Sequence, residues 1–175
     1  MRAFSPLLLL LVLFPGAPAL SGCDSGVERC TSTDQFAFQD ITPKGTRLGD
    51  VAAPGSCVSV NYVGRLADGS GTFDEGTIAD STGQTFRVAS NSGVIAGFPL
   101  GVNGQQVGQT RRVTIPPNLG YGTETLPAKP GTVGGVEGGE PYVGIPSCST
   151  LEFDIKLVSV QQDVRAECKN LRPKR

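Results

Sequence analysis

Short segments in which apolar and polar residues alternate constrain the fold of this chain more than any other feature. Three of them are clear: Cys57–Leu66, Thr110–Ile115 and Ser149–Val158. A period of two residues is that of a β-strand with one buried face. Weaker extended segments are expected at 36–41, at TFDEG (72–76) and at QTFRVA (84–89). The sequence therefore predicts an antiparallel, half-buried sheet with loops on one side.

Glycine and proline separate these segments. The chain has 24 glycines and 13 prolines among its 175 residues, whereas the two together average about 12% of a protein. This composition favours short strands joined by turns over a helical bundle. Pro99 suits the first turn of one short helix, and no long helix is predicted. The length suits one domain, or one domain with tails.

The stretch TRRVTIPPNLGYG (110–122) ends a strand abruptly and then presents a tyrosine. Two prolines stop the hydrogen-bonded ladder because neither has a backbone N–H group. Two glycines flank Tyr121, which indicates a loop. A turn explains the prolines and the glycines but does not explain the aromatic residue. Tyr121 is therefore a candidate functional residue.

The absence of histidine excludes several classes of chemistry. Ser-His-Asp hydrolysis, Cys-His proteolysis and zinc binding by histidine all require it. With 15 basic and 16 acidic residues, the chain has no excess charge for binding nucleic acid or an acidic membrane. The glycine-rich run PGTVGGVEGGEPYVG (130–144) lacks the lysine of a phosphate-binding loop. It is interpreted as a flexible surface insertion.

Residues 1–22 have the pattern of an export signal: Arg2, an apolar run LLLLLVLF (7–14) and then small residues. The apolar run is too short to span a bilayer. Two cleavage patterns compete. APA at 17–19 fits an ordinary secretory signal, whereas LSGC at Leu20–Cys23 resembles a bacterial lipobox, in which Cys23 would carry the lipid.

The number of cysteines favours the lipobox. Five thiols leave one unpaired in an oxidising compartment. If Cys23 carries lipid, the remaining four can form two disulfides: Cys30, Cys57, Cys148 and Cys168. The protein is therefore expected to be a lipoprotein anchored to a membrane and facing the periplasm or the cell surface. Simple secretion is the alternative.

Three motifs now occur in order: VNYVGRLADGSGTFD (60–74), GVIAGFPLGVNGQQVGQTRRVTIPPNLGYG (93–122) and IPSCSTLEFDIKLVSV (145–160). They resemble the FKBP-type peptidyl-prolyl cis–trans isomerases, the macrolide-binding rotamases, over residues 36–160. The resemblance implies an FKBP-like α+β fold, a twisted five-stranded antiparallel sheet wrapped around one short helix. Residues 23–35 are then an N-terminal spacer, and 161–175 a C-terminal tail.

The resemblance also implies an apolar pocket between the sheet and the helix. Its catalytic residues would be Tyr62, Phe73, Asp74, Tyr121 and Phe153, and its further substrate-binding residues Phe86, Val94, Ile95, Phe98 and Ile145. Tyr121 would reach over the pocket and meet the carbonyl of the ligand. Phe98 stands where the family usually has a tryptophan. Two roles for Asp74 stay open: it orients Tyr62 or polarises the bound amide, or it is a structural carboxylate in a turn.

The implied chemistry is the isomerisation of X–Pro bonds. Amide resonance sets a barrier of about 18–20 kcal/mol, and a dry pocket favours the less polar, twisted transition state over the planar amide. This chemistry requires no metal and no cofactor. The implied partners are proline-containing polypeptides and macrolide immunosuppressant-type ligands, with a membrane reached through the lipid and no nucleic acid.

The strand order of the family ranks the disulfides as well. It prefers Cys30–Cys148 and Cys57–Cys168, which would tie the spacer and the tail to the domain. The function that follows is a prolyl isomerase acting on proteins that fold outside the cytoplasm. Two alternatives stay open: a catalytically weak module that binds a proline-containing segment of one partner, and a chaperone that acts through an insertion at 128–144.

Overall fold

The computed structural model describes residues 29–42, 49–77, 83–129, 141–162 and 168. Several predictions concern residues outside these ranges. They are the export signal at 1–22, the lipid-bearing Cys23, the centre of the insertion at 130–140, and most of the tail at 161–175. In the part of the chain that is described, no helix combines the length and the apolar character needed to cross a membrane.

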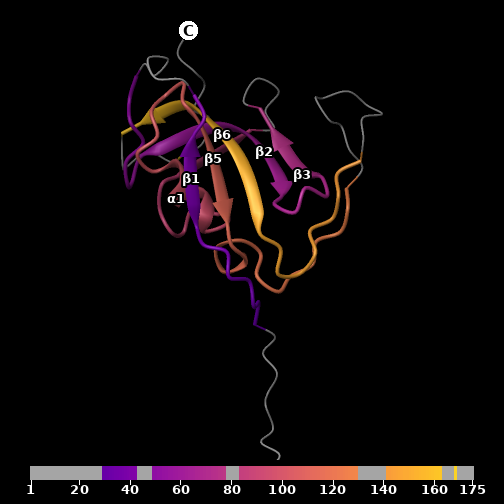
Figure 1. Ribbon diagram of the computed structural model, residues 1–175. Coiled ribbons are helices and arrows are strands. Elements are labelled where there is room, and N and C mark those ends of the chain that lie inside the picture. The colour runs from indigo at the N-terminus through magenta and orange to yellow at the C-terminus, as the bar shows by residue number, and fades with distance from the viewer. Residues whose placement is uncertain (1–28, 43–48, 78–82, 130–140, 163–167, 169–175) are drawn as a thin grey trace, which may run out of the picture.

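The described residues form one antiparallel sheet, one short α-helix and one turn of 3₁₀ helix (Figure 1). In chain order the elements are β1 (Ala37–Asp40), β2 (Cys57–Leu66), β3 (Thr72–Gly76), β4 (Gln84–Arg87), α1 (Gly97–Val102), β5 (Thr110–Ile115), η1 (Pro117–Leu119) and β6 (Leu151–Gln161). The alternating segments of the sequence thus become strands, and β6 ends three residues later than predicted.

The sheet has six strands in five positions. Its order is β1-β5-β6-β2-β3, and β4 also pairs with β2. The first half of β2 pairs with β4 from Cys57 to Val60, and the second half pairs with β3 from Tyr62 to Arg65. Because β3 and β4 occupy successive stretches of the same edge, the expected five-stranded arrangement is confirmed.

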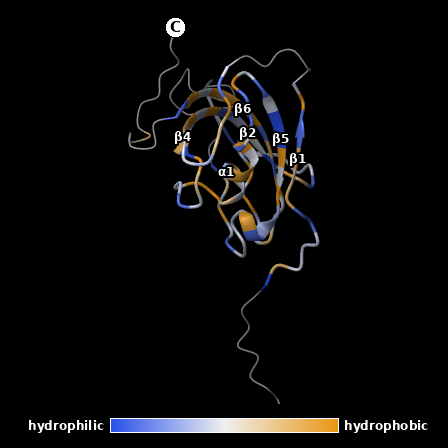
Figure 2. Cartoon of the chain, turned by 90° about the vertical axis from the view of Figure 1, so that its left-hand side faces the viewer, coloured by the Kyte–Doolittle hydropathy of each residue, from blue (hydrophilic) through white to orange (hydrophobic). Residues whose placement is uncertain are grey.

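The inner face of the sheet carries the core. Val58 and Val60 of β2, Val113 and Ile115 of β5, and Leu151, Ile155 and Leu157 of β6 are fully buried. Hydrophilic and hydrophobic residues alternate along β5 (Figure 2). On the outer face Asp154 accepts hydrogen bonds from Arg112 at 2.7 Å and from Arg65 at 2.9 Å. The guanidinium of Arg112 and, to a lesser degree, that of Arg65 lower the pKa of the Asp154 carboxyl.

Helix α1 lies directly on β5. A Cβ atom added at Gly101 would stand 2.7 Å from Cγ2 of Val113, so only glycine permits this approach. Arg111 of β5 is 4% exposed and holds the C-terminal end of the helix. Its Nη1 donates to the carbonyl oxygens of Gly101 and Asn103 at 2.9 and 3.0 Å, and its Nε donates to Asp40 at 2.7 Å. These bonds join β1, β5 and the helix, and so fix the position of Phe98.

Two disulfides connect segments that are far apart in the sequence. Cys30 is bonded to Cys148 and Cys57 to Cys168, with Cα atoms 5.1 Å and 5.4 Å apart. These are the pairs that the resemblance implied. The first bridge holds the segment before β1 against the chain that leads into β6, and the second holds Cys168 at the start of β2.

Candidate functional site

A cavity of about 240 Å³ opens between the sheet and α1. Five elements and two loops contribute to its wall: Tyr62 from β2, Phe73 and Asp74 from β3, Gln84 from β4, Gly93, Val94 and Ile95 from the loop before the helix, Phe98 from α1, Tyr121 from the loop after η1 and Phe153 from β6. Most of these side chains are aromatic or aliphatic. A cavity of this kind suits a small apolar group such as a proline ring.

The floor of the cavity is a cluster of aromatic rings centred on Phe98, which is 3% exposed. Its ring centroid lies 5.0 Å from that of Phe153 and 5.7 Å from that of Tyr62, in edge-to-face geometry. Phe73 meets Phe153 in the same way at 5.4 Å. Such contacts stabilise each ring by about 0.5–1.5 kcal/mol beyond its buried area. The floor is therefore closely packed although the chain has no tryptophan.

Gly64 makes room for two of these rings. A Cβ atom at this position would lie 2.7 Å from ring atoms of both Phe73 and Phe153. Gly64 pairs with Asp74 on one side and with Phe153 on the other, so any side chain here would push both rings out of place. The alternation of β2 predicted Gly64 on the inner face. That it leaves space for the two rings follows only from the packing.

The polar groups of the cavity are few and connected. The hydroxyl of Tyr62 donates to Oδ2 of Asp74 at 3.0 Å. Burial, with a smaller contribution from the charge of Asp74, raises the pKa of Tyr62 well above its ordinary value, and a side-chain hydrogen bond from Gln84 opposes the rise. Tyr62 is therefore neutral and its hydroxyl proton is directed at the carboxylate. The structure thus agrees with a role for Asp74 in orienting Tyr62.

Tyr121 owes its position to the two prolines that end β5. The carbonyl of Pro117 accepts hydrogen bonds from the backbone N–H groups of Gly120 and Gly122, at 3.0 and 2.8 Å. Cys148 in turn donates its N–H to the carbonyl of Gly122 at 2.8 Å. The loop is thus held by a 3₁₀ turn at one end and by a bridged cysteine at the other. Burial raises the pKa of Tyr121, so this hydroxyl also stays protonated.

Eight of the ten predicted pocket residues line the cavity, and Phe86 and Ile145 do not. Phe86 packs beneath Phe98, with ring centroids 5.6 Å apart, and is 2% exposed. Ile145 is buried in the core at the root of the insertion. Both lie behind the wall in this structure, and their contact with substrate stays a prediction.

Gln84 and Gly93 line the cavity and were not predicted. Side chains two residues apart in a strand point to the same face, so Gln84 and Phe86 share one face of β4. The expected apolar pocket favoured the phenylalanine. The alternation alone could have identified Gln84 as a candidate. Only the structure shows that Phe86 is buried beneath Phe98 and that Gln84 reaches the cavity.

The root of the insertion lies beside the cavity wall. Two isolated antiparallel β-bridges join its two strands of chain, one between Leu126 and Ile145 and the other between Lys129 and Tyr142. Val143 donates its N–H to the carbonyl of Thr72 at 3.0 Å, which docks the root onto the start of β3. Both ends of the insertion are thus attached to the domain.

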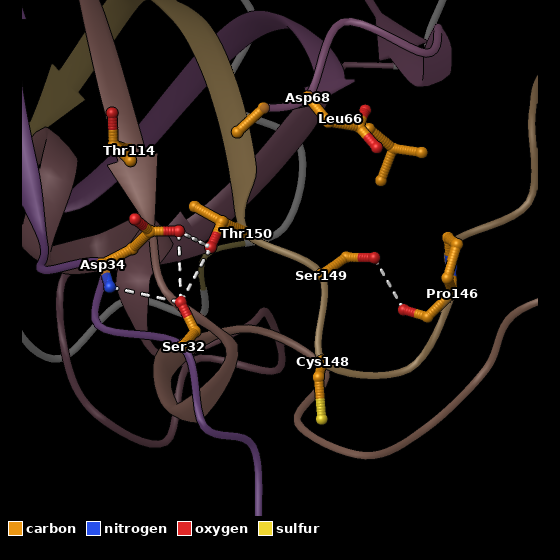
Figure 3. A pocket seen from close by; sticks show the side chains of 10 residues that line it. Ser32, Asp34, Leu66, Asp68, Thr114, Pro146, Cys148, Ser149 and Thr150 are labelled. Atoms are coloured by element: carbon orange, nitrogen blue, oxygen red, sulfur yellow. Dashed lines mark hydrogen bonds between the residues drawn. The ribbon is translucent and has the colours of Figure 1, made fainter.

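A second cavity, of about 500 Å³, lies at the ends of β2 and β5 near the start of β6 (Figure 3). Asp34, Ser32 and Thr150 lie on one side of it, and Leu66 and Asp68 on the other. The hydroxyl of Thr150 donates to Asp34 at 2.5 Å, and that of Ser32 donates to Asp34 at 3.1 Å. These bonds fasten the segment before β1 to β6. Although larger, this cavity has no aromatic wall, and three of its polar residues, Ser32, Asp34 and Thr150, bond to one another.

A metal site has no support in the described residues, where no three Cys, Asp or Glu side chains group closely enough to hold an ion. The chemistry on offer in the aromatic cavity consists of an apolar floor, two neutral tyrosines and one oriented carboxylate.

Comparison with known proteins points in one direction. Residues 49–158 match the family model of the FKBP-type peptidyl-prolyl cis-trans isomerases. FK506-binding protein 3 of Debaryomyces hansenii is 39% identical over 117 residues, which are 66% of this chain and 22% of that protein. The chain thus spans about a fifth of the length of such relatives.

Solved structures agree with the sequence comparison. A peptidyl-prolyl cis-trans isomerase from Pseudomonas syringae is 28% identical, with a TM-score of 0.50 over 74% of this chain and 78% of that one. The three FKBP domains of wheat FKBP73 align with a TM-score of 0.57 at 21% identity, over 77% of this chain and 50% of that one. The second likeness concerns the fold alone.

Proposed function

This chain belongs to the family of FKBP-type peptidyl-prolyl cis–trans isomerases, and on that premise we propose that it accelerates X–Pro isomerisation during the folding of proteins outside the cytoplasm. The observation that carries the proposal is the aromatic cavity with Tyr121 at its rim and Phe98 in its floor. Uncatalysed isomerisation takes about 10–100 s at 25 °C, slow enough to limit folding.

In the proposed mechanism the apolar wall of the cavity replaces water around the substrate amide. A proline ring enters over Phe98 and Phe153, and the amide leaves water. When the C–N bond rotates, resonance is lost and the carbonyl becomes less polar. A dry wall therefore stabilises the twisted amide more than the planar one. No bond to the protein forms or breaks.

Tyr121 is the proposed donor to the substrate carbonyl. Tyr62 already directs its proton to Asp74, whereas no hydrogen bond joins the Tyr121 hydroxyl to another described residue. A neutral phenol keeps its proton across the physiological pH range, and this fits the raised pKa of Tyr121. The same cavity is the proposed site for macrolide immunosuppressant-type ligands.

The experiment is prolyl isomerisation of X–Pro peptides by the oxidised chain from Asp24 to Arg175. We expect clear acceleration, with kcat/KM reduced about tenfold by Tyr121→Phe, the equivalent of one lost hydrogen bond of about 1.4 kcal/mol. Phe153→Ala should reduce it further because the floor opens. Tyr142→Phe is the matched control, since Tyr142 lies at the root of the insertion and not in the cavity wall.

A folded sample that leaves the peptide rate at its buffer value would contradict the proposal. It would favour the alternative of a module that binds a proline-containing segment without turnover. The chaperone alternative predicts a different result: replacing residues 130–141 by a two-residue turn would abolish client binding and leave peptide isomerisation unchanged. The bridge between Lys129 and Tyr142 offers the strand ends that such a turn can join.

The location is part of the same proposal. We propose export and lipid attachment at Cys23, supported by the apolar run, the LSGC pattern and the pairing of the other four cysteines. Metabolic labelling with a radioactive fatty acid in an expressing bacterium should mark the wild-type chain and leave Cys23→Ala unlabelled. Label on neither protein would favour simple secretion.

A further inference from the structure

Gln84 is the polar residue of the cavity wall for which neither the fold nor the proposed mechanism accounts. It is the first residue of β4 and pairs with Val60 of β2. Phe86, on the same face, goes down into the core beneath Phe98. Gln84 stands at the cavity instead, and its side chain is partly exposed. A strand that only needed to close the core could carry an apolar residue at both positions.

The surroundings make an amide conspicuous at this place. Apart from the two tyrosine hydroxyls, Asp74 and Gln84 are the polar side chains among the ten residues of the lining. Next to the amide, the Tyr62 hydroxyl donates to Asp74 at 3.0 Å, and the nearby Gln84 side chain opposes the rise in the pKa of Tyr62. A hydroxyl has one hydrogen and two lone pairs, so the oxygen of Tyr62 can still accept from an amide N–H while it donates to Asp74. Gln84, Tyr62 and Asp74 thus line the same cavity wall.

The amide keeps hydrogen-bonding capacity. A carboxamide has two N–H donors and one carbonyl acceptor, so at least one donor and the carbonyl remain even when one N–H faces Tyr62. Among the described residues no partner for these two groups is present. Because the residue is partly exposed at the cavity, a bound polypeptide can reach the remaining donor and the carbonyl.

We propose that Gln84 is a specificity-determining residue, which selects substrates that carry a hydrogen-bonding side chain next to the proline. The inference rests on the proposed function, since it assigns a preference to the same cavity. A bound chain that satisfies the amide replaces its water at little loss. An apolar substrate residue next to the proline removes water from the Gln84 amide without replacing its hydrogen bonds, and this weakens binding. The wall thus discriminates against apolar neighbours more than it rewards polar ones.

The position of Tyr62 does not depend on Gln84. Its ring packs on Phe98 and Phe153, and its hydroxyl is held by Asp74. Without Gln84 the hydroxyl keeps Asp74 as its partner. Loss of the amide should therefore change the choice of substrate more than it changes the rate for the best substrate.

The test compares substrates on one enzyme. Wild type and Gln84→Met, which keeps the length of the side chain, are assayed on two matched peptide pairs: Gln–Pro against Leu–Pro, then Pro–Gln against Pro–Leu. Exchange NMR gives the isomerisation rate, and shift titration of the same samples gives the Kd. Gln84 contacts the residue on one side of the proline, and only the peptide pair that varies this residue should respond. For that pair, the ratio of kcat/KM of the polar peptide to that of the apolar peptide should be about twofold to tenfold lower in Gln84→Met than in wild type. This factor corresponds to one hydrogen bond.

Gln39→Met is the matched control. Gln39 lies exposed on β1, the edge strand, and outside the cavity lining. This variant should keep the wild-type ratio on every peptide. Gln84→Ala, which also lacks the amide and adds no bulk, should shift the ratio in the same direction as Gln84→Met, so that a packing defect peculiar to methionine is recognised.

An unchanged ratio on both sides of the proline, in a folded Gln84→Met sample, would overturn the inference. Absence of any turnover by the wild-type enzyme would count against the proposed function instead. The Kd ratios would still decide the role of Gln84 in that case, because the amide acts on binding as well as on the rate.

Discussion

Tyr62 and Tyr121 face one cavity, but their hydroxyl groups serve different purposes. The hydroxyl of Tyr62 is held by Asp74, and Tyr121 lies at the tip of a loop with no such partner among the described residues. At the scale of single residues, one hydroxyl of the wall is therefore committed to a carboxylate, and the other is an available donor. Asp74 accepts the hydrogen bond from Tyr62, and Tyr121 is the proposed donor to the bound amide.

A prediction at this scale concerns alkaline pH. The pKa of Tyr62 is raised by burial above its ordinary value of 10.0, so above pH 10 the unfolded chain loses this proton while the folded chain keeps it. The free energy of unfolding should then fall as the pH rises above 10. Urea unfolding at pH 8 and pH 10.5 should show a smaller fall for Tyr62→Phe than for wild type. An equal fall in both proteins would contradict the assignment.

At the scale of elements, the contact between α1 and β5 positions the cavity floor. The sequence predicted both elements, because β5 alternates and Pro99 suits a first helical turn. Their close approach was not predictable, since it depends on Gly101 facing Val113 across the core. The same limit applies at β4, where alternation identified the face and packing decided which residue on it lined the cavity.

Gly101→Ala tests this contact. Alanine is the better helix former by about 1 kcal/mol, yet its methyl group would stand 2.7 Å from Val113 Cγ2. We expect a net loss of about 1–3 kcal/mol in the free energy of unfolding, as in other overpacked cores. Urea unfolding measures it. Val113→Ala should recover part of the loss in the double variant, and simple additivity of the two costs would argue against the steric explanation.

At the scale of the whole molecule, the two disulfides hold the ends of the described chain to the sheet. Cys30–Cys148 closes 118 residues and also steadies the loop of Tyr121 through the bond from Cys148 to Gly122. Cys57–Cys168 closes 111 residues at the opposite end of β2 and β6. A domain tied in this way suits the oxidising compartment that was proposed for it.

Replacing either pair by serine should lower the free energy of unfolding by about 2–5 kcal/mol. Because the two loops are nearly equal in length, their entropic contributions should agree within a few tenths of a kcal/mol. Removing Cys30–Cys148 should in addition lower kcat/KM, since Tyr121 loses part of its support. Urea unfolding and the peptide assay of the two double variants check this, and equal kcat/KM in both would contradict the second expectation.

The sequence by itself determined the strands, the single short helix, the family and most of the cavity wall. These follow from local causes: alternation, the missing N–H of proline, and motifs that stay together along the chain. Only the tertiary structure decided that Gln84 and not Phe86 meets the cavity, that Ile145 lies behind its wall, and that Gly64 makes room for two rings. These placements depend on which side chains pack over each face of the sheet, and those side chains come from residues distant in the chain.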